Sequence, residues 1–357
     1  MTHTRIDISA RQGRYPVLLH EVAGPWLHGA VLEQAPGGRI AIITDVQVAA
    51  QHEAPLRAGL EAGGRQVFCH RLPIGEASKS LEAAAAAYDA LLLAGLDRND
   101  TIVALGGGVV GDLAGFVAAT YLRGIGCVQV PTSTLAALDA SVGGKTALNT
   151  PRGKNLIGTI TPPSAVLICI AHLATQSRRQ HAAGLVEALK IGLTHDAELF
   201  AEVEAQAAPL LAWAPAALSA VLARAIALKA AVVGRDEFET GERAVLNFGH
   251  TAGHAIEAAA HYQLLHGEAV ALGMLAEMTW AVQSGLSPQQ LLVDLQQALA
   301  ALEAPTQWRE VALDRSALRL DKKRCGHELI LPVVTAVGQW TLKRLPSAQL
   351  EAFLAPP

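Results

Sequence analysis

Short apolar runs alternate with helical segments through the first half of the chain, and this alternation constrains the fold more than any other feature. The strand-like runs are Ile40–Thr44, Val67–His70, Ile102–Leu105, Cys127–Val130 and Val166–Ile170. An alanine-rich helical pattern runs from Leu81 to Gly95, and another begins after Gly111. Short apolar runs separated by helices are typical of a parallel sheet with helices on its faces. The sequence therefore predicts an α/β domain here.

The pattern changes after about Leu173, where strand signals nearly stop and long helical segments run to about Ala301. A short β-like stretch, Glu328–Val334, comes near the end. The chain has 357 residues, which is enough for two domains of ordinary size. We expect an α/β domain at residues 1–172 and a mainly α-helical domain at residues 173–357.

Composition excludes several classes of protein. Hydrophobic residues make up 51% and charged residues 17%, which indicates a packed globular chain and not a disordered one. The net charge of −4 argues against a general nucleic-acid or membrane-surface binder. The first ten residues lack the pattern of a signal peptide, and Arg224 and Lys229 interrupt the apolar run Ala216–Gly234. We expect a cytoplasmic protein without a membrane span.

A glycine-rich loop, Gly106 to Asp112 (G-G-G-V-V-G-D), follows the strand Thr101–Leu105 and opens a helix. Glycines in this context let the backbone approach a pyrophosphate at a helix N-terminus. The acid that usually binds the ribose about twenty residues later is missing, whereas Asp45 ends the first strand. We infer a nucleotide site from several strand ends, with Asp45 at the ribose and Glu76 and Lys79 nearby. The alternative is a tight turn without a ligand.

Two lysines follow in neighbouring glycine-containing loops. The segment Asp139 to Thr146 (D-A-S-V-G-G-K-T) is not a P-loop, because an aspartate stands where that motif needs its first glycine. Lys145 and the pair Lys154-Asn155 would suit a phosphate or carboxylate of a ligand. The alternative is that these lysines are merely solvated.

The segment Arg243 to Glu257 (R-A-V-L-N-F-G-H-T-A-G-H-A-I-E) spaces polar residues by four, three and four positions, at Arg243, Asn247, His250 and His254. On a continuous helix these side chains would share one face. Histidines at i and i+4 suit a metal such as zinc. The alternative is one hydrogen-bonded core histidine and one surface histidine.

Further metal ligands are available in the same half of the chain. Glu187 and Lys190 lie three apart in an apolar helical pattern, and His266 begins another. His250, His266 and Glu187 would make a His₂Glu set with an open position, as in catalytic zinc sites. A simple helix ion pair is the alternative for Glu187 and Lys190. Lys229 stands in an otherwise apolar helix, which is unusual without a partner.

Seven motifs occur in order from about Asp45 to about Pro332: G-G-G-V-V-G-D, S-V-G-G-K-T, R-G-K-N, G-L-V-E-A-L-K, R-x₃-N-x₂-H-x₃-H, H-G-E-A-V and D-K-K. Together they resemble the 3-dehydroquinate synthase family of the sugar-phosphate cyclase superfamily. The resemblance implies a homodimer of chains with a Rossmann-like NAD-binding domain and a mainly helical metal- and substrate-binding domain. It also implies the conversion of 3-deoxy-D-arabino-heptulosonate 7-phosphate to 3-dehydroquinate and phosphate, by NAD-mediated oxidation, elimination, reduction, ring opening and aldol closure.

The resemblance assigns roles residue by residue. The implied ligands of zinc or cobalt are Glu187, His250 and His266, and His254 then handles substrate and protons. The implied catalytic and substrate-binding residues are Asp139, Lys145, Asn155, Lys190, Lys229, Arg243, Asn247, His254 and Lys322 (favoured over Lys323), with Arg123 reaching the neighbouring subunit's site. The implied cofactor-binding residues are Asp45, Glu76, Lys79, Gly107, Gly108, Val109, Asp112, Thr132, Ser133, Lys145, Lys154 and Thr175.

The chain departs from the family pattern at Ala183, Val186 and Ile191, which concerns packing more than reaction type. A metal- and NAD-dependent glycerol or alcohol dehydrogenase is an alternative, opposed by the two lysine motifs. A sister cyclase is opposed by Arg243, Asn247 and Lys322, which such enzymes usually change. A non-catalytic NAD-binding or scaffold protein is opposed by the retained Glu187 and histidines.

Overall fold

The computed structural model describes residues 3–10, 13–260, 263–314, 324–325 and 328–354. The chain forms two compact units, one of residues Met1–Ser177 with Leu218–Gly234 and the other of Arg178–Ala217 with Arg235–Pro357. The segment Leu218–Gly234 thus belongs to unit 1, so no single boundary in the sequence separates the two units. The domain boundary at 172/173 stays a prediction.

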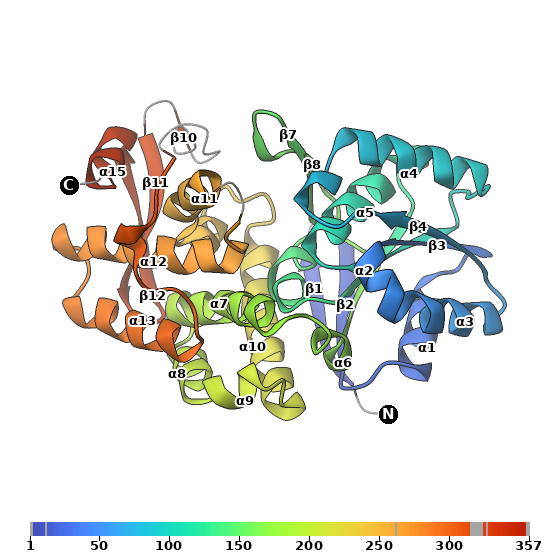
Figure 1. Ribbon diagram of the computed structural model, residues 1–357, viewed down its shortest axis with the longest axis horizontal. Coiled ribbons are helices and arrows are strands. Elements are labelled where there is room, and N and C mark those ends of the chain that lie inside the picture. Colours follow the sequence, from blue (N-terminus) through green and yellow to red (C-terminus); the bar gives the residue numbers. More distant parts are fainter. Residues whose placement is uncertain (1–2, 11–12, 261–262, 315–323, 326–327, 355–357) are drawn as a thin grey trace. The chain divides into compact units, whose positions relative to one another are not determined.

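The described residues of unit 1 form a seven-stranded sheet in the order β1-β2-β9-β6-β5-β3-β4. Figure 1 labels β1, β2, β3 and β4 of this sheet. All neighbouring strands are parallel except β1 and β2, which pair antiparallel at one edge. The predicted parallel sheet is therefore confirmed, and two strands that were not expected join it: β2, parallel to β9, and the antiparallel edge strand β1. The strands are β1 (Thr4–Ala10), β2 (Gly13–His20), β3 (Arg39–Asp45), β4 (Gln66–Leu72), β5 (Thr101–Gly106), β6 (Gly126–Pro131) and β9 (Ala165–Cys169).

Alternating side chains of the central strands build two cores, one on each face of the sheet. On β3, Ala41 and Ile43 pack with α4 (Leu81–Leu93) and α5 (Gly108–Thr120). Ile40 and Ile42 of the same strand pack on the opposite face with α1 (Pro25–Gln34) and α3 (Ala54–Ala62). Both sets are buried, so these strands are apolar on both faces, as a helix-covered parallel sheet requires.

Shorter elements connect and flank this sheet. The hairpin of β7 (Lys145–Thr150) and β8 (Gly153–Ile160) is antiparallel, and β7 packs against α5. The other short elements are α2 (Val46–Val48), η1 (Ala49–Glu53), η2 (Glu76–Ser78), η3 (Tyr121–Arg123), η4 (Ala136–Ala140) and α6 (Ile170–Leu173). Most of the long helix α10 (Pro215–Arg235) also belongs to unit 1.

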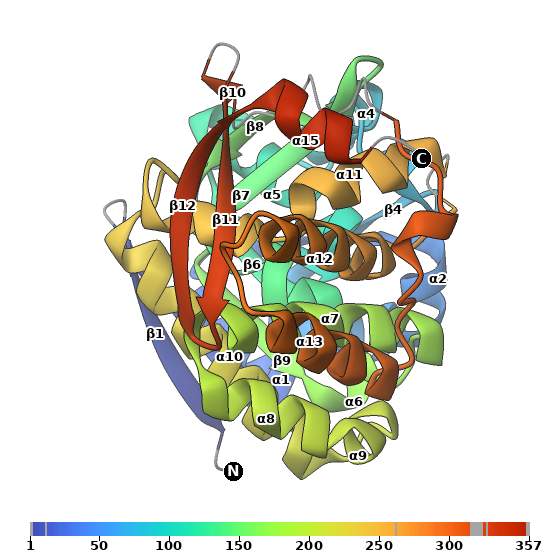
Figure 2. The ribbon, with the colours of Figure 1, turned by 90° about the vertical axis from the view of Figure 1, so that its left-hand side faces the viewer.

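Unit 2 is mainly helical, as predicted. Its helices include α7 (Arg178–His195), α8 (Ala197–Ala205), α9 (Ala207–Leu211), α11 (His250–Ala259), α12 (His266–Gln283), α13 (Gln289–Ala301) and α15 (Ser347–Phe353). The predicted β-like stretch is β11 (Glu328–Ala336), which pairs with β12 (Gln339–Pro346) and lies beside α12 (Figure 2). The short elements are η5 (Glu242–Asn247), η6 (Trp308–Glu310) and β10 (Arg324–Cys325).

The predicted continuous helix from Arg243 to Glu257 is wrong. The segment folds as the 3₁₀ helix η5, a break at Phe248 and Gly249, and the helix α11. Gly249 has φ of +78°, and a Cβ there would lie 2.4 Å from Cγ of Met274 on α12. Close packing against α12 therefore requires a glycine and a left-handed backbone at this point, and both end the helical path.

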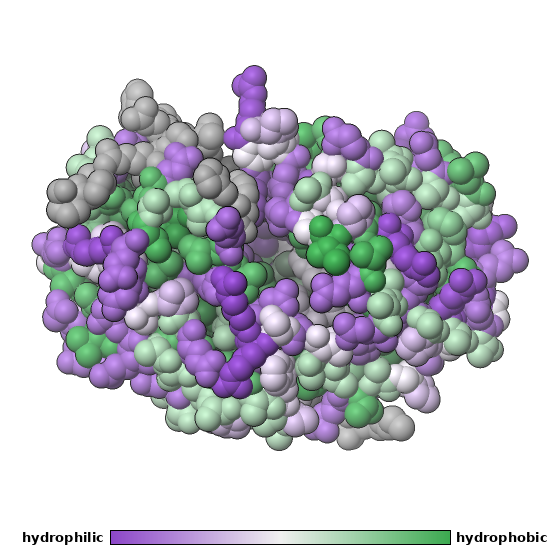
Figure 3. Space-filling view, in the orientation of Figure 1, coloured by the Kyte–Doolittle hydropathy of each residue, from purple (hydrophilic) through white to green (hydrophobic). Residues whose placement is uncertain are grey.

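One helix, α10, is long and apolar enough to cross a membrane by length and composition, which differs from our expectation. Half of its most apolar window is buried inside the protein, and its Lys229 is buried as well. A core helix of a soluble protein passes the same test. The face shown in Figure 3 carries hydrophobic patches separated by hydrophilic ones, as on ordinary protein surfaces.

Candidate functional site

The glycine loop of unit 1 has the geometry of an anion-binding turn. Gly107 caps α5, which begins at Gly108 and so before Gly111, after which the helix was predicted to begin. A Cβ at Gly111 would meet Oε1 of Gln129 at 2.9 Å, so close packing explains this glycine. At Gly107 and Gly108 a Cβ would make contacts of only 3.5 and 3.4 Å. Internal packing leaves these two glycines largely unexplained, whereas close approach of a ligand phosphate would explain them.

Polar residues predicted at the nucleotide site meet beside this loop. The buried Lys79 ammonium forms an ion pair with Asp112 on α5 and donates to Oδ1 of Asn155 at 2.5 Å. Glu76 accepts a hydrogen bond from Asn149 at 2.8 Å, and Nζ of Lys154 lies 3.8 Å from its carboxylate. The sequence analysis missed Asn149, which carries no motif of its own. Burial raises the pKa of Asp112 to about 6, although Lys79 opposes this shift.

Other predicted cofactor positions lie at strand ends of the same sheet. Asp45 ends β3, and its Oδ1 accepts the N–H groups of Gln47 and Val48 at 2.9 Å, so it caps α2. Thr132 follows β6 and donates its backbone N–H to Gly106. Val109 stands in the first turn of α5, and Ser133 Oγ would lie 3.5 Å from a Cβ at Gly107.

Thr175 belongs to a small polar cluster after β9 that the sequence analysis did not anticipate. Its hydroxyl donates to the carbonyl of His172 at 2.7 Å and lies 3.0 Å from Nε2 of His52. Because the hydroxyl proton goes to His172, Nε2 of His52 is the donor in the second bond. Burial, with the neighbouring His52 ring, lowers the pKa of His172 to about 4.

Lys229, the lysine in the apolar helix α10, does have a partner. Its buried ammonium forms an ion pair with the carboxylate of Asp139 and also donates to the Asp139 backbone carbonyl at 2.5 Å. Asp139 lies in the π-helical turn η4 with its side chain 36% exposed. The structure therefore brings together two residues that were predicted separately.

Arg123, the last residue of η3, and Lys145, the first residue of β7, are both exposed in unit 1. Leu122, Arg123 and Gly124 all have positive φ, at 50°, 69° and 117°. Two consecutive non-glycine residues in this region are costly and occur mostly where a loop serves a function. Lys145 begins β7 directly after Gly143 and Gly144, which also have positive φ.

In unit 2 the predicted metal set comes together. Glu187 of α7, His250 of α11 and His266 of α12 each offer a ligand atom, and these atoms all lie within 4.8 Å of one another. Nε2 of His250 lies 3.9 Å from Oε1 of Glu187. The Glu187 side chain is buried, its Oε2 pairs with the ammonium of Lys190 at 2.5 Å, and its Oε1 accepts no hydrogen bond from the described residues. A buried carboxylate oxygen that lacks a hydrogen bond beside two imidazoles fits a divalent cation.

A second group overlaps this one. His254, Glu257 and His266 also offer ligand atoms within 4.8 Å, and Nδ1 of His266 lies 3.6 Å from Oε2 of Glu257. The rings of His250 and His254 are 5.5 Å apart, so the two histidines do share a face of α11. Glu257 was not among the predicted site residues.

Three more predicted residues of unit 2 are Lys190, which pairs with Glu187 on α7, and Arg243 and Asn247, which precede α11. Arg243 is buried and donates to the backbone carbonyl of Glu237, and Asn247 donates to the carboxylate of Glu239. The sequence analysis missed Glu237 and Glu239. Lys322 lies outside the described residues.

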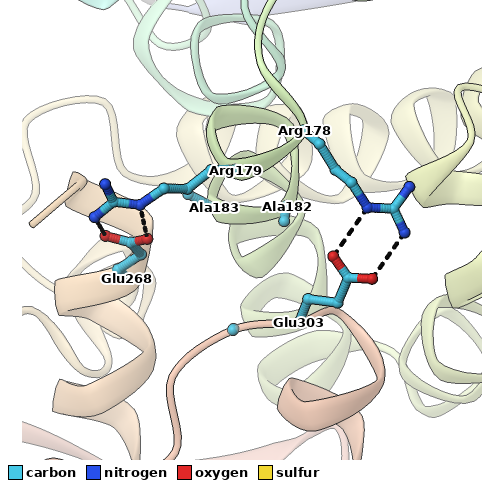
Figure 4. Close-up of a pocket in the computed structure, with 7 residues that line it drawn as sticks. Arg178, Arg179, Ala182, Ala183, Glu268 and Glu303 are labelled. Carbon is cyan, nitrogen blue, oxygen red and sulfur yellow. Dashed lines mark hydrogen bonds and ion pairs between the residues drawn. The ribbon is translucent and has the colours of Figure 1, made fainter.

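A pocket of about 320 Å³ opens in unit 2 beside the first turns of α7 and α12. Arg178 and Arg179 point to opposite sides of it, each bound through two hydrogen bonds to a carboxylate, Glu303 and Glu268 respectively (Figure 4). Ala182 and Ala183 line its floor. Because the two arginines and two glutamates of the pocket are hydrogen-bonded to each other, we assign the pocket no ligand.

Comparison with solved structures defines the class of protein. The fold is similar to a 2-epi-5-epi-valiolone synthase from Streptomyces hygroscopicus subsp. jinggangensis with NAD⁺ and Zn²⁺ bound, at a TM-score of 0.87, 28% identity and 97% of both chains. It is also similar to a 2-deoxy-scyllo-inosose synthase complexed with carbaglucose-6-phosphate, NAD⁺ and Co²⁺, at a TM-score of 0.86, 25% identity, 98% of this chain and 99% of the other. The fold is that of the sugar-phosphate cyclases.

Sequence comparison gives the particular family. The profile described as 3-dehydroquinate synthase N-terminal matches residues 69–183, and the C-terminal profile matches residues 184–324. The 3-dehydroquinate synthase of Symbiobacterium thermophilum is 46% identical over 295 residues, which cover 82% of each chain. The chain belongs to the 3-dehydroquinate synthase family. The resemblance drawn from the seven motifs is confirmed, and with it an enzyme of the lyase type.

Proposed function

We propose that this enzyme converts 3-deoxy-D-arabino-heptulosonate 7-phosphate to 3-dehydroquinate and inorganic phosphate, a step of the shikimate pathway to aromatic amino acids. The observation that carries the proposal is the set of buried Glu187, buried His250 and partly exposed His266, whose ligand atoms converge within 4.8 Å. Three protein ligands with an open position suit a metal that binds substrate hydroxyls. Zinc or cobalt held there supplies a Lewis acid for the hydroxyl that is oxidised and for the resulting ketone.

NAD would bind in unit 1, and two observations support this site. The amide groups at Gly107, Gly108 and Val109 lie at the N-terminus of α5, where a pyrophosphate is favoured. The polar residues that surround the loop are Glu76, Lys79, Asp112, Lys154 and Asn155. When bound, NAD supplies reversible hydride transfer at C5 of the substrate and is not consumed. Asp45, Thr132, Ser133 and Thr175 complete the proposed cofactor contacts.

The remaining residues would bind the substrate's two anionic ends and its hydroxyls. Cations concentrate in the motifs although the protein is acidic, which fits a ligand with a carboxylate and a phosphate. We assign this role to Arg123, Asp139, Lys145, Asn155, Lys190, Lys229, Arg243, Asn247 and Lys322. The proton removed before phosphate leaves goes to exposed His254 or to the substrate's own phosphate.

We extend the proposal to the oligomeric state and the location. The enzyme is a cytoplasmic homodimer in which Arg123 reaches the phosphate in the neighbouring subunit. The strained loop at Leu122 and Arg123 supports this role, because such backbone strain is kept where a side chain must be presented.

Product analysis tests the proposal. The purified protein is incubated with the heptulosonate phosphate, NAD⁺ and zinc, and the product is identified by mass spectrometry and NMR. We expect 3-dehydroquinate, loss of activity after chelation, and recovery when zinc or cobalt is returned. Turnover of glucose 6-phosphate or sedoheptulose 7-phosphate instead would identify a sister cyclase. Steady NADH production from glycerol would identify a dehydrogenase.

A further inference from the structure

Both histidines of the metal set are the first residues of their helices. His250 begins α11 and His266 begins α12. A helix N-terminus carries unpaired N–H groups and a partial positive charge of about half a unit. A divalent cation held by these two histidines would therefore face two positive helix ends, which weakens its binding unless negative charge offsets them.

Glu277 supplies such a charge at α11. Its side chain is 1% exposed on α12, and its carboxylate accepts hydrogen bonds from the N–H groups of Gly249 at 2.8 Å and Ala252 at 3.1 Å. These are the cap residue and the third residue of α11. Gly249 has no side chain with which to cap the helix, and packing against Met274 forbids one. A carboxylate from the neighbouring helix thus takes the place of the missing cap.

Glu268 has the matching position at α12. It accepts the N–H of Leu265 at 2.9 Å, which closes the first turn of the helix that begins at His266. Arg179 holds the carboxylate through two hydrogen bonds of 2.6 and 2.7 Å (Figure 4). Each ligand histidine therefore stands at a helix end that a carboxylate of α12 caps.

We propose that Glu277 is a positioning residue that sets the affinity of the Glu187–His250–His266 set for its divalent cation, with Glu268 in a weaker version of the same role. The inference rests on the metal set of the proposed function. Glu277 acts through α11, because it fixes the first turn that carries His250 and offsets the positive helix end beside the cation.

The test measures zinc affinity by competition with a chromophoric chelator. Glu277→Gln keeps the shape of the side chain, but it removes the negative charge and one of the two oxygen atoms that accept hydrogen bonds from α11. We expect the Kd for zinc to rise about 10- to 100-fold, as is usual when an outer-shell partner of a metal site is lost. Glu303→Gln removes a carboxylate of the same unit that binds Arg178, and we expect it to leave the Kd unchanged.

A merely structural role would give a different result. It would lower the melting temperatures of the metal-free and zinc-loaded proteins equally. Weaker zinc binding would instead reduce the difference between these two melting temperatures. If Glu277→Gln does not fold, Glu268→Gln is the second variant, and we expect a several-fold rise in its zinc Kd. A wild-type zinc Kd in either folded variant would overturn the inference. Failure of the wild-type protein to bind zinc would instead overturn the proposed metal site.

Discussion

The ammonium of Lys190 lies 2.5 Å from Oε2 of Glu187, and the two side chains are 2% and 1% exposed. They stand one helical turn apart on α7, so the pair is a helix ion pair, and one of its members is also the proposed metal ligand. A cation that binds Glu187 joins a carboxylate already compensated by Lys190. The pair therefore stabilises the metal-free protein and competes with the metal for the same charge.

Removal of Lys190 is expected to separate these two effects. Lys190→Met leaves the buried Glu187 carboxylate without its ammonium partner, which should lower the free energy of unfolding of the metal-free protein by about 3 kcal/mol. The zinc affinity should rise, because the metal no longer competes with Lys190. Urea unfolding with and without zinc measures both quantities. Zinc binding weaker than in the wild-type protein would show that Lys190 supports the metal site and does not oppose it.

The Asp139–Lys229 pair should respond asymmetrically to substitution. Lys229 is buried, whereas the Asp139 side chain is 36% exposed and water can solvate it. Asp139→Ala removes a carboxylate from a buried ammonium, so we expect a loss of about 2 kcal/mol or more in the free energy of unfolding. Lys229→Met leaves an exposed carboxylate and should cost clearly less. Equal losses in the two variants would contradict the burial argument.

The low pKa of His172 predicts a loss of stability in acid. The pKa of His172 is about 4 in the folded state and 6.5 ordinarily. Between pH 6.5 and pH 4 this histidine is therefore protonated in the unfolded chain but neutral in the folded protein. The free energy of unfolding should therefore fall as the pH drops from 6.5 to 4, by about 3 kcal/mol for this residue. His172→Gln should remove this part of the pH dependence in denaturant unfolding. An identical slope in the variant and the wild-type protein would refute the assignment.

Subunit mixing tests the role of Arg123. Arg123→Ala and Lys145→Ala should each cut turnover by orders of magnitude while leaving the circular dichroism spectrum intact, since each removes a proposed substrate cation. In a hybrid dimer of one Arg123→Ala subunit and one Lys145→Ala subunit, the site of the Arg123→Ala subunit has its own Lys145 and an intact Arg123 from the partner. When equal amounts of the two variants are refolded together, half of the dimers are hybrids with one intact site each. About a quarter of wild-type activity should then be restored. No recovery would place Arg123 in its own subunit's site or outside it.

The parallel sheet could be predicted because its strands are apolar on both faces, a pattern that local sequence carries directly. The edge strand β1 (Thr4–Ala10) could not, because its residues are mixed and Ile8 is its buried hydrophobic residue. The helix over Arg243 to Glu257 failed at Gly249, where contact with Met274 of a distant helix decides the backbone. Polar spacing alone does not report such a contact.

In the candidate site, too, residue types could be predicted from local sequence, whereas features that depend on contacts between helices could not. Glu187, His250 and His266 were identified as a possible ligand set from residue types, and the structure brings them together. Their role as metal ligands stays a prediction. Glu257 and Glu277 were missed because an isolated glutamate in a helical pattern usually lies on the surface. Their burial arises from the packing of α11 against α12, which no local signal reveals.

The most direct test of the account is phosphate release from 3-deoxy-D-arabino-heptulosonate 7-phosphate, measured with and without added NAD⁺ on protein freed of bound nucleotide, before and after chelation. The account predicts release that requires both metal and catalytic amounts of NAD⁺, with many phosphates released per NAD⁺ and no net NADH. Phosphate release that continues without NAD⁺, or NADH formed in step with phosphate, would contradict it.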